Sequence, residues 1–301
     1  MDKDVYEKYL SAGKIASEAR DFGINLIKTG RKFIEVAEKV ESKILDSGAA
    51  LSFPVNIAIN DLAAHYSPRN DDELVFKRGD VVKLDVGSHI DGYIADTAIT
   101  VEIETNKYDK MIKASSDALD FAISHMRANI DLSEIGKIIE GTIKSYGYNS
   151  IDNLTGHSLD RYELHSGMSV PSISNTFCRV KPKPGDVIAI EPFATNGIGH
   201  VISGKGSNIY ILKPTIKSKI IRDNKLKILL NRMSAKFKTL PFAQRWCNNM
   251  SDNIDISLRK LSYLGLVKNY SQLVEQNGGI VTQKEHTVIV MEDGCEVITV
   301  T

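Results

Sequence analysis

Two neighbouring apolar segments, each carrying one aspartate, restrict the possible folds of this chain more than any other feature. The first, at 80–86, alternates between two faces, and the second, at 93–103, is rich in β-branched residues. The Asp-Gly dipeptide at 91–92 between them is a strong hairpin signal. We therefore predict a pair of antiparallel strands that places Asp85 and Asp96, 11 residues apart, on adjacent strands.

Acids inside apolar strands need a physical reason, because aspartate is disfavoured in strand interiors. A metal ion supplies one, since it neutralises carboxylates that would otherwise repel each other. Two more acids lie in similar surroundings, because Glu191 closes the apolar run at 187–190 and Glu285 opens a later strand. Burying four carboxylates together without cations would cost on the order of several kcal/mol per charge.

His157, which follows Gly156, could add an imidazole to the four acids. A set rich in oxygen with one nitrogen suits Mn, Fe, Co or Zn better than it suits a cysteine-type zinc site. Each residue alone has an ordinary explanation: a strand aspartate at an edge or turn, a loop histidine, or Glu191 ending a strand before Pro192. The metal hypothesis rests on the apolar strand context that all the acids share.

Composition places the chain among ordinary soluble proteins. Of its 301 residues, 42% are hydrophobic and 25% are charged, which is enough to bury a sizeable core. The 38 basic and 38 acidic residues give no net charge, so only a local patch could attract nucleic acid or an acidic membrane. The three cysteines are widely spaced, and no segment reads as a signal peptide or a membrane span. We expect a cytoplasmic protein.

Hydrophobic spacing divides the chain into helices and strands of an α/β (α+β) protein. Helices are predicted at 5–28, 32–45, 107–127 and 131–146, and further strands at 53–59, 186–194, 208–212, 280–291 and 296–301. Residues 217–270 read as polar and helical, with few strand signals. We therefore predict one domain formed by 1–213 and 275–301, interrupted by a helical subdomain at 214–274.

Short motifs are spread in order along nearly the whole chain. They are Phe53-Pro54-Val55-Asn56, Ala63-Ala64-His65-Tyr66-Ser67-Pro68, Leu84-Asp85-Val86-Gly87, Asp91-Gly92-Tyr93-Ile94-Ala95-Asp96-Thr97-Ala98, Leu154-Thr155-Gly156-His157, Leu164-His165-Ser166-Gly167, Ile190-Glu191-Pro192-Phe193-Ala194-Thr195, and Gly278-Gly279-Ile280-Val281 running into Glu285-His286-Thr287. Together they resemble the methionine aminopeptidases, in particular the archaeal-like type 2 form. Jointly these motifs are highly specific.

The resemblance implies a "pita-bread" fold, in which two similar halves enclose the metal site under a curved antiparallel sheet. It also implies two divalent ions, Co, Mn, Fe or Zn, and a role for each motif residue. Asp85 resembles the chelator of one ion, Asp96 and Glu285 the bridging carboxylates, His157 and Glu191 ligands of the second ion, His65 and His165 the histidines that contact the substrate, and Phe53 a wall of the methionine pocket.

The type assignment depends on an insertion. Glu191 and Glu285 are 94 residues apart, whereas the corresponding acids of type 1 enzymes are separated by a short connection. No N-terminal extension like that of the eukaryotic forms precedes the first motif, which leaves docking on the ribosome unexplained. Lys284 stands where the family usually has an aromatic residue and could alter the rim of the site, and Ser67 replaces a common threonine.

The implied activity is removal of the initiator methionine when the second residue is small. The metal pair would activate a water, His165 would donate to the developing oxyanion, and Glu191 would pass a proton to the leaving amine. On composition alone His65 reads as a turn histidine, and only the resemblance gives it a role in orienting the peptide. We expect nascent chains with an N-terminal methionine as substrates, transient ribosome association, a monomer, and neither membrane nor sequence-specific nucleic acid as partner.

Two other readings remain open. A prolidase or aminopeptidase P has the same fold and five ligands, but usually carries a large N-terminal domain. A non-catalytic homologue that binds RNA or protein partners typically lacks metal ligands, whereas here all five positions are filled.

Overall fold

In the first half of the chain, two helices pack on an antiparallel sheet. The structure is a computed structural model that describes residues 1–175, 178–213 and 221–301. The first helix begins where the carboxylate of Asp2 accepts a hydrogen bond from the backbone N–H of Val5 at 3.0 Å. The elements of this half are α1 (Lys3–Leu26), α2 (Phe33–Asp46), β1 (Ala50–Leu51), β2 (Asn56–Ile59), β3 (Leu62–Ala64), β4 (Val81–Ile90) and β5 (Tyr93–Glu102).

The predicted hairpin is confirmed as β4 and β5, which pair without interruption from Val81↔Glu102 to Ile90↔Tyr93. Asp91 and Gly92 form its turn with positive φ angles of 52° and 92°, as a two-residue hairpin loop requires. Strands β1 and β2 also pair with β4, so β4 is a central strand of this sheet.

The second half repeats the pattern of paired helices beside a sheet. Helices α3 and α4 pack on each other, and their apolar faces cover β8, β10 and β14. Helix α4 begins after its N-cap Asp131, whose side chain accepts from the backbone N–H of Ser133. The elements are α3 (Asp109–His125), α4 (Leu132–Ser145), β6 (Asn149–Ser150), β7 (Thr155–Leu159), β8 (Ser169–Pro171), β9 (Val187–Ile190), β10 (Phe193–Thr195), β14 (Val281–Gln283), β15 (His286–Val290) and β16 (Cys295–Val297).

Two strands that the sequence predicts as continuous are each broken at an acid. The strand predicted at 186–194 becomes β9 and β10, separated by Glu191 and Pro192, and the one at 280–291 becomes β14 and β15, separated by Lys284 and Glu285. The partners Ala189↔Thr287 and Phe193↔Gln283 keep one register across both breaks. The breaks therefore face each other and bring the two glutamates together.

The segment predicted as a helical insertion is only partly helical. It contains α5 (Asn224–Phe237), the 3₁₀ helix η2 (Gln244–Met250) and α6 (Ile254–Tyr263), but also β12 (Phe242–Ala243) and β13 (Val267–Glu275). Strand β13 pairs with β11 (Val201–Leu212) and with β3, so the prediction of helix up to residue 270 is wrong from Val267 onward. Pairing with distant strands overrode the weak local signal. Residues 214–220 of the predicted insertion lie outside the described residues.

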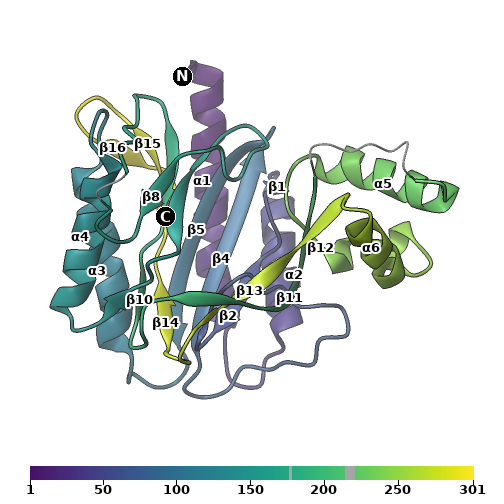
Figure 1. Ribbon diagram of the computed structural model, residues 1–301, viewed down its shortest axis with the longest axis horizontal. Helices are drawn as coiled ribbons and strands as arrows, with labels where there is room; N and C mark the ends of the chain where they lie inside the picture. Colours follow the sequence, from purple (N-terminus) through teal and green to yellow (C-terminus); the bar gives the residue numbers. More distant parts are fainter. Residues whose placement is uncertain (176–177, 214–220) are drawn as a thin grey trace.

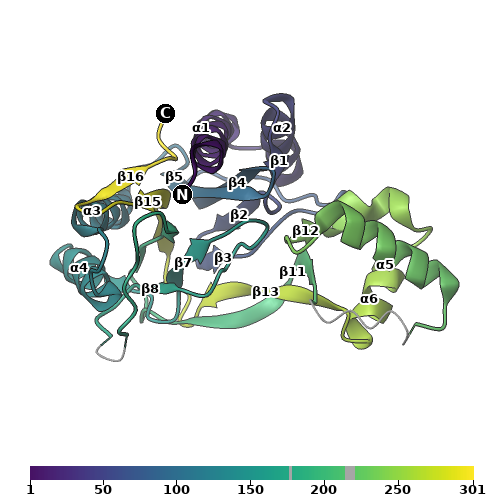
Figure 2. The same ribbon diagram turned by 90° about the horizontal axis from the view of Figure 1, so that it is seen from above.

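The halves and the inserted elements are arranged around one central region. Helices α3 and α4 lie at one end of the molecule and α5 and α6 at the other (Figure 1). Seen from above, α1 and α2 cover one side of β4, and β11 and β13 lie on the opposite side (Figure 2). Helices α5 and α6 share an apolar cluster with η2, separate from the clusters under α1–α2 and α3–α4. No helix in the described residues is long and apolar enough to cross a bilayer.

Candidate metal centre

All eight residues that the sequence singles out line one cavity of about 70 Å³. The cavity lies between the two halves, and the inserted strands contribute to its wall. Seven other residues complete the lining; sequence reasoning assigned none of them a role, although Asn56, Ala64 and Leu164 lie within the quoted motifs. The full lining is Phe53, Asn56, Ala64, His65, Asp85, Asp96, His157, Leu164, His165, Glu191, Ile209, Pro241, Tyr270, Gln283 and Glu285.

Strand register puts the two aspartates on the same face. Asp85 is opposite Ala98 and Asp96 is opposite Gly87, so the aspartates form a diagonal pair across β4 and β5. Gly87 itself is required beside them, because a Cβ there would lie 2.1 Å from the Phe53 ring. The absence of a side chain at Gly87 lets that ring close the wall of the cavity.

The other three residues come from the second sheet. His157 on β7 pairs with Ala189 on β9, and Thr287 pairs with the same alanine from β15. Glu191 and Glu285 each lie two residues from these partners, so alternation sends both side chains to the face that His157 occupies. Because the strands break at these positions, Glu191 and Glu285 lie outside the regular strand pairing.

Three of the five side chains lie close enough together to hold one ion. One ligand-type atom each from Asp96, His157 and Glu285 lies within 4.8 Å of the others. The Nε2 atom of His157 is 3.8 Å from Asp96 Oδ2 and 3.7 Å from Glu191 Oε1. Such spacings are too long for direct hydrogen bonds and leave room for a cation between the groups.

Buried polar atoms at this centre have no partner within the described residues. They include Asp85 Oδ1, Asp96 Oδ1 and His157 Nδ1. In that part of the chain no Lys or Arg nitrogen lies within 4.0 Å of the four carboxylates. Orphaned buried acceptors are rare in folded proteins, and a cation is the group that would satisfy several at once.

Burial of the four acids and His157 close together shifts their pKa values. Burial raises the pKa of Asp85 to about 7. Burial first, and then the neighbouring carboxylates, hold the pKa values of Asp96, Glu191 and Glu285 well above their ordinary range. Burial lowers the pKa of His157 to about 3, which keeps its imidazole neutral as a metal ligand requires. The donor set therefore fits a divalent metal.

Comparison with known sequences gives a consistent result. The profile of "Metallopeptidase family M24" matches residues 7–222. Proteins named methionine aminopeptidase from Methanocaldococcus jannaschii, Archaeoglobus fulgidus and Pyrococcus horikoshii are 45%, 44% and 42% identical, each over 99% of this chain and 100% of the relative. The chain belongs to the methionine aminopeptidases of family M24. Membership of this metallopeptidase family implies a divalent metal, which the cluster can hold.

Solved structures show the same fold at lower sequence identity. A thermophilic Arx1 superposes with a TM-score of 0.84 at 17% identity, covering 99% of this chain and 91% of that one. The methionine aminopeptidase from Rickettsia prowazekii gives 0.72 at 19% identity, covering 100% and 98%. The prolidase from Pyrococcus furiosus gives 0.63 at 19% identity, with 100% of this chain but only 65% of that one. The predicted pita-bread fold of the M24 family is confirmed.

The two further histidines of the M24 motifs stand at the edge of the acid cluster. The His165 ring lies 4.2 Å from the His157 ring, centre to centre. His65 takes a positive φ of 64°, donates from Nδ1 to the carbonyl of Ser271 at 3.3 Å, and meets Tyr270 edge-on. Burial lowers the pKa of both, that of His65 to about 4. Both are neutral near pH 7, and His65 keeps Nε2 as an acceptor.

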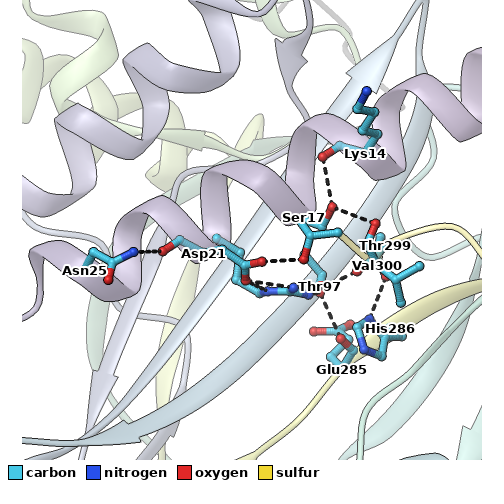
Figure 3. A network of polar contacts seen from close by, with 11 residues as sticks. Lys14, Ser17, Asp21, Asn25, Thr97, Glu285, His286, Thr299 and Val300 are labelled. Atoms are coloured by element: carbon cyan, nitrogen blue, oxygen red, sulfur yellow. Dashed lines mark hydrogen bonds and ion pairs between the residues drawn. The ribbon is translucent and has the colours of Figure 1, made fainter.

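A hydrogen-bonded network supports the M24 acids from behind (Figure 3). Arg20 on α1 donates to Thr97 Oγ1 at 2.7 Å, and Thr97 donates to the carbonyl of Glu285 at 2.9 Å. Thr287 Oγ1 accepts from the backbone N–H of Asp96 and donates to its carbonyl. The backbones that carry Asp96 and Glu285 are therefore tied together and to α1.

Lys284, which the sequence suggested could alter the rim of the site, does not line the cavity. Its charged neighbours are Arg20, Asp21 and Asp120. Adjacent residues of an extended chain point to opposite sides, so the inward direction of Glu285 turns Lys284 toward α1. Gln283, two residues before Glu285, does line the cavity and donates to Glu191 and Glu285 at 3.3 Å each.

Proposed function

We propose that this chain hydrolyses the N-terminal methionine from new polypeptides whose second residue is small. The observation that supports the proposal most is the convergence of five ligand-type side chains, with orphaned buried atoms, in one cavity. The naming of relatives at 42–45% identity over 99% of the chain adds the substrate class.

We propose that the centre holds two divalent ions, drawn from Co, Mn, Fe and Zn. Asp85 would bind one ion, His157 and Glu191 the other, and Asp96 with Glu285 would serve both, since these last two are the most enclosed acids of the cluster. When bound, the ions would lower the pKa of a water and polarise the scissile carbonyl.

The chain's own groups account for the remaining steps. The neutral imidazole of His165, next to His157, would donate its N–H to the oxygen on which negative charge develops. Glu191 would carry a proton to the leaving amine, because its carboxylate lines the same cavity, 3.7 Å from His157 Nε2. His65 would accept at Nε2 from a backbone N–H of the peptide.

Specificity would follow from the apolar part of the lining. Phe53, Leu164 and Ile209 offer contacts for a flexible thioether side chain. The small volume of the cavity, about 70 Å³, would exclude larger side chains. A small second residue would be favoured because little room remains beside the metal ligands.

The domain boundaries, the oligomeric state and the cellular location are also proposals. We propose a catalytic domain of residues 1–213 and 275–301, with 214–274 as the inserted subdomain, supported by the separate apolar cluster of α5, η2 and α6. We also propose a cytoplasmic monomer that meets nascent chains during transient ribosome association. Sedimentation of the purified protein at several concentrations would test the monomer.

Peptide hydrolysis tests the function directly. Purified full-length protein, stripped of metal and then supplied with Mn, Co, Fe or Zn, should release methionine from Met-Ala-Ser. It should bind two equivalents of the activating ion, measured by elemental analysis, and should not cleave Ala-Pro dipeptide. Absence of methionine release with every ion would refute the proposal, and preference for Ala-Pro would favour the prolidase reading.

A further inference from the structure

The charges of this chain are divided unevenly between its regions. Residues 214–274 contain twelve Lys and Arg but only three Asp and Glu, a net charge of +9. The other residues contain 26 basic and 35 acidic side chains, so they carry the balancing −9. The zero net charge of the whole chain therefore conceals a strongly basic region. A charge concentrated in this way creates a local field that a uniform distribution would not.

Most of these basic residues are exposed and make no ion pair within the described residues. Of those within the described residues, Arg245 alone is buried, and nine others are exposed: Arg222, Lys225, Lys227, Arg232, Lys236, Lys238, Arg259, Lys260 and Lys268. The single ion pair that any of the nine makes within the described residues joins Lys225 to Asp252 at 3.6 Å, with both side chains almost fully exposed. Exposed pairs of this kind neutralise little.

Helix geometry gathers several of these cations on one face. Lys225, Arg232 and Lys236 follow each other on α5 at spacings of seven and four residues, which places them along one stripe. Lys225, Arg232 and Lys260 line a groove of about 330 Å³ between α5 and α6, in which they outnumber the two acids, Asp223 and Asp252. We call this surface, formed by Lys225, Arg232, Arg259, Lys260 and Tyr263, the α5–α6 face.

An aromatic ring stands among the cations of the α5–α6 face. Tyr263 is 93% exposed at the end of α6, beside Arg259 and Lys260 in a second hollow. A fully exposed tyrosine is free to stack on an unpaired base, for instance where an RNA duplex ends. Ile228 and Ile256, the two exposed apolar side chains of the groove beside the face, come from different helices and do not form the continuous apolar strip that an amphipathic membrane helix presents.

We propose that the α5–α6 face binds the phosphate backbone of RNA, without reading its sequence. This inference rests on the proposed function, because new N-termini emerge from the ribosome, whose surface is largely RNA. No residue of the face lines the catalytic cavity, and α5 and α6 lie at one end of the molecule (Figures 1 and 2). RNA can therefore occupy the face without blocking the cavity, and the acidic remainder of the chain is repelled from the same phosphates.

The test compares three full-length proteins: wild type, the face variant Lys225→Glu/Arg232→Glu/Lys260→Glu, and the control variant Lys28→Glu/Lys77→Glu/Lys137→Glu. The control lysines are exposed and lie outside 214–274, so both variants change the net charge equally. Binding of a fluorescent 20-base-pair RNA duplex is measured by anisotropy at 50 and 200 mM salt, methionine release from Met-Ala-Ser is measured in parallel, and melting temperatures verify folding.

Wild type should bind the duplex more weakly at the higher salt, as counterion release requires. The face variant should bind at least about tenfold more weakly than wild type, with the slope of log affinity against log salt reduced by about 3. The control variant should lose less than about twofold, and all three proteins should release methionine at equal rates. RNA binding that follows this pattern without methionine release would support the face and refute the proposed function.

Three outcomes would overturn the proposal. Wild type could cleave the peptide but fail to bind RNA at 50 mM salt. The control variant could lose as much affinity as the face variant. Wild type could bind vesicles of phosphatidylcholine with one-fifth phosphatidylserine more tightly than it binds the duplex. If the face variant then failed to bind the vesicles, the face would be a membrane-binding surface.

Discussion

Two clusters of buried charge in this molecule have opposite organisation. At the metal centre four carboxylates face one another, and oxygens of Asp85 and Asp96 have no partner within the described residues. At the junction of α2 with η2, both oxygens of Glu41 are bonded: Oε1 to Arg245 and to the backbone N–H of Val55, and Oε2 to the indole of Trp246 at 2.9 Å. Burial raises the pKa of Glu41 too, but Arg245 opposes that rise.

The buried charges at the α2–η2 junction stabilise the fold, whereas those at the metal centre are arranged to bind a ligand. Arg245 also donates to Ser67 Oγ and to the carbonyl of Pro68, each at 2.8 Å, so the junction fastens η2 to the loop that follows His65. Its internal pairing indicates a structural role. The carboxylates of the metal centre have no Lys or Arg partner within the described residues and need cations from outside, which indicates a binding role.

The largest effect is expected for Asp96→Asn at the metal centre. The change removes a proposed bridging carboxylate, so kcat/KM for Met-Ala-Ser should fall by at least about 10³-fold and less metal should be retained. The metal-free variant should melt no lower than metal-free wild type, because one repelling acid has gone. Elemental analysis and calorimetry measure both. Asp46→Asn, an exposed control, should be neutral, and full activity in Asp96→Asn would remove the bridging role.

Removal of a charged side chain from the α2–η2 junction should reduce stability and not activity. Arg245→Met leaves Glu41 buried without its main partner and should lower the free energy of unfolding by about 3–5 kcal/mol. Activity of the folded fraction should change far less than in Asp96→Asn. Urea unfolding measures the effect. Adding Glu41→Gln should restore part of the loss; if the double variant is less stable than Arg245→Met, the pairing argument is wrong.

A histidine at the edge of the metal centre should separate catalysis from metal binding. His165→Ala removes the proposed donor to the oxyanion and should reduce kcat by about 10²-fold with bound metal unchanged. Steady-state kinetics and metal content give the two readouts. His125→Ala, on the exposed surface of α3, is the matched control. Loss of metal in parallel with activity would assign His165 to the coordination of the ions.

The pH dependence of the metal-free protein should expose the cost of burying acids at its centre. The folded pKa of Asp85, about 7, lies above the unfolded value, so the folded state holds more protons between the two. This contribution to stability is complete below about pH 4 and is lost as the pH rises toward about 7. Melting temperatures of metal-free wild type should fall over that interval. Bound metal should abolish the fall, and an upward trend in the metal-free protein would show that burial does not raise the pKa of these acids.

Sequence reasoning found the features that local chemistry determines. Strand alternation and the turn at Asp91 placed Asp85 and Asp96 on one face, and apolar context marked Glu191 and Glu285. It missed Ile209 and Tyr270 in the cavity, because their position depends on the pairing of β11 and β13, which are distant in sequence from β3. It also treated charge as one total and so overlooked the basic insertion.

The smallest effect is expected at Lys284, the neighbour of Glu285 that departs from the family pattern. Its side chain lies near Arg20 and Asp21 on α1, outside the cavity, and burial lowers its pKa. Lys284→Met should therefore change kcat/KM by less than about twofold and leave metal content unchanged, because the substitution alters only a side chain that points toward α1 and away from the cavity. Stability should change by about 1 kcal/mol or less, since the substitution removes a half-buried cation next to Arg20 but also its attraction to Asp21. A tenfold change in KM would show that Lys284 affects substrate binding through Glu285. The contacts of Lys284 with α1 would then be part of the metal centre.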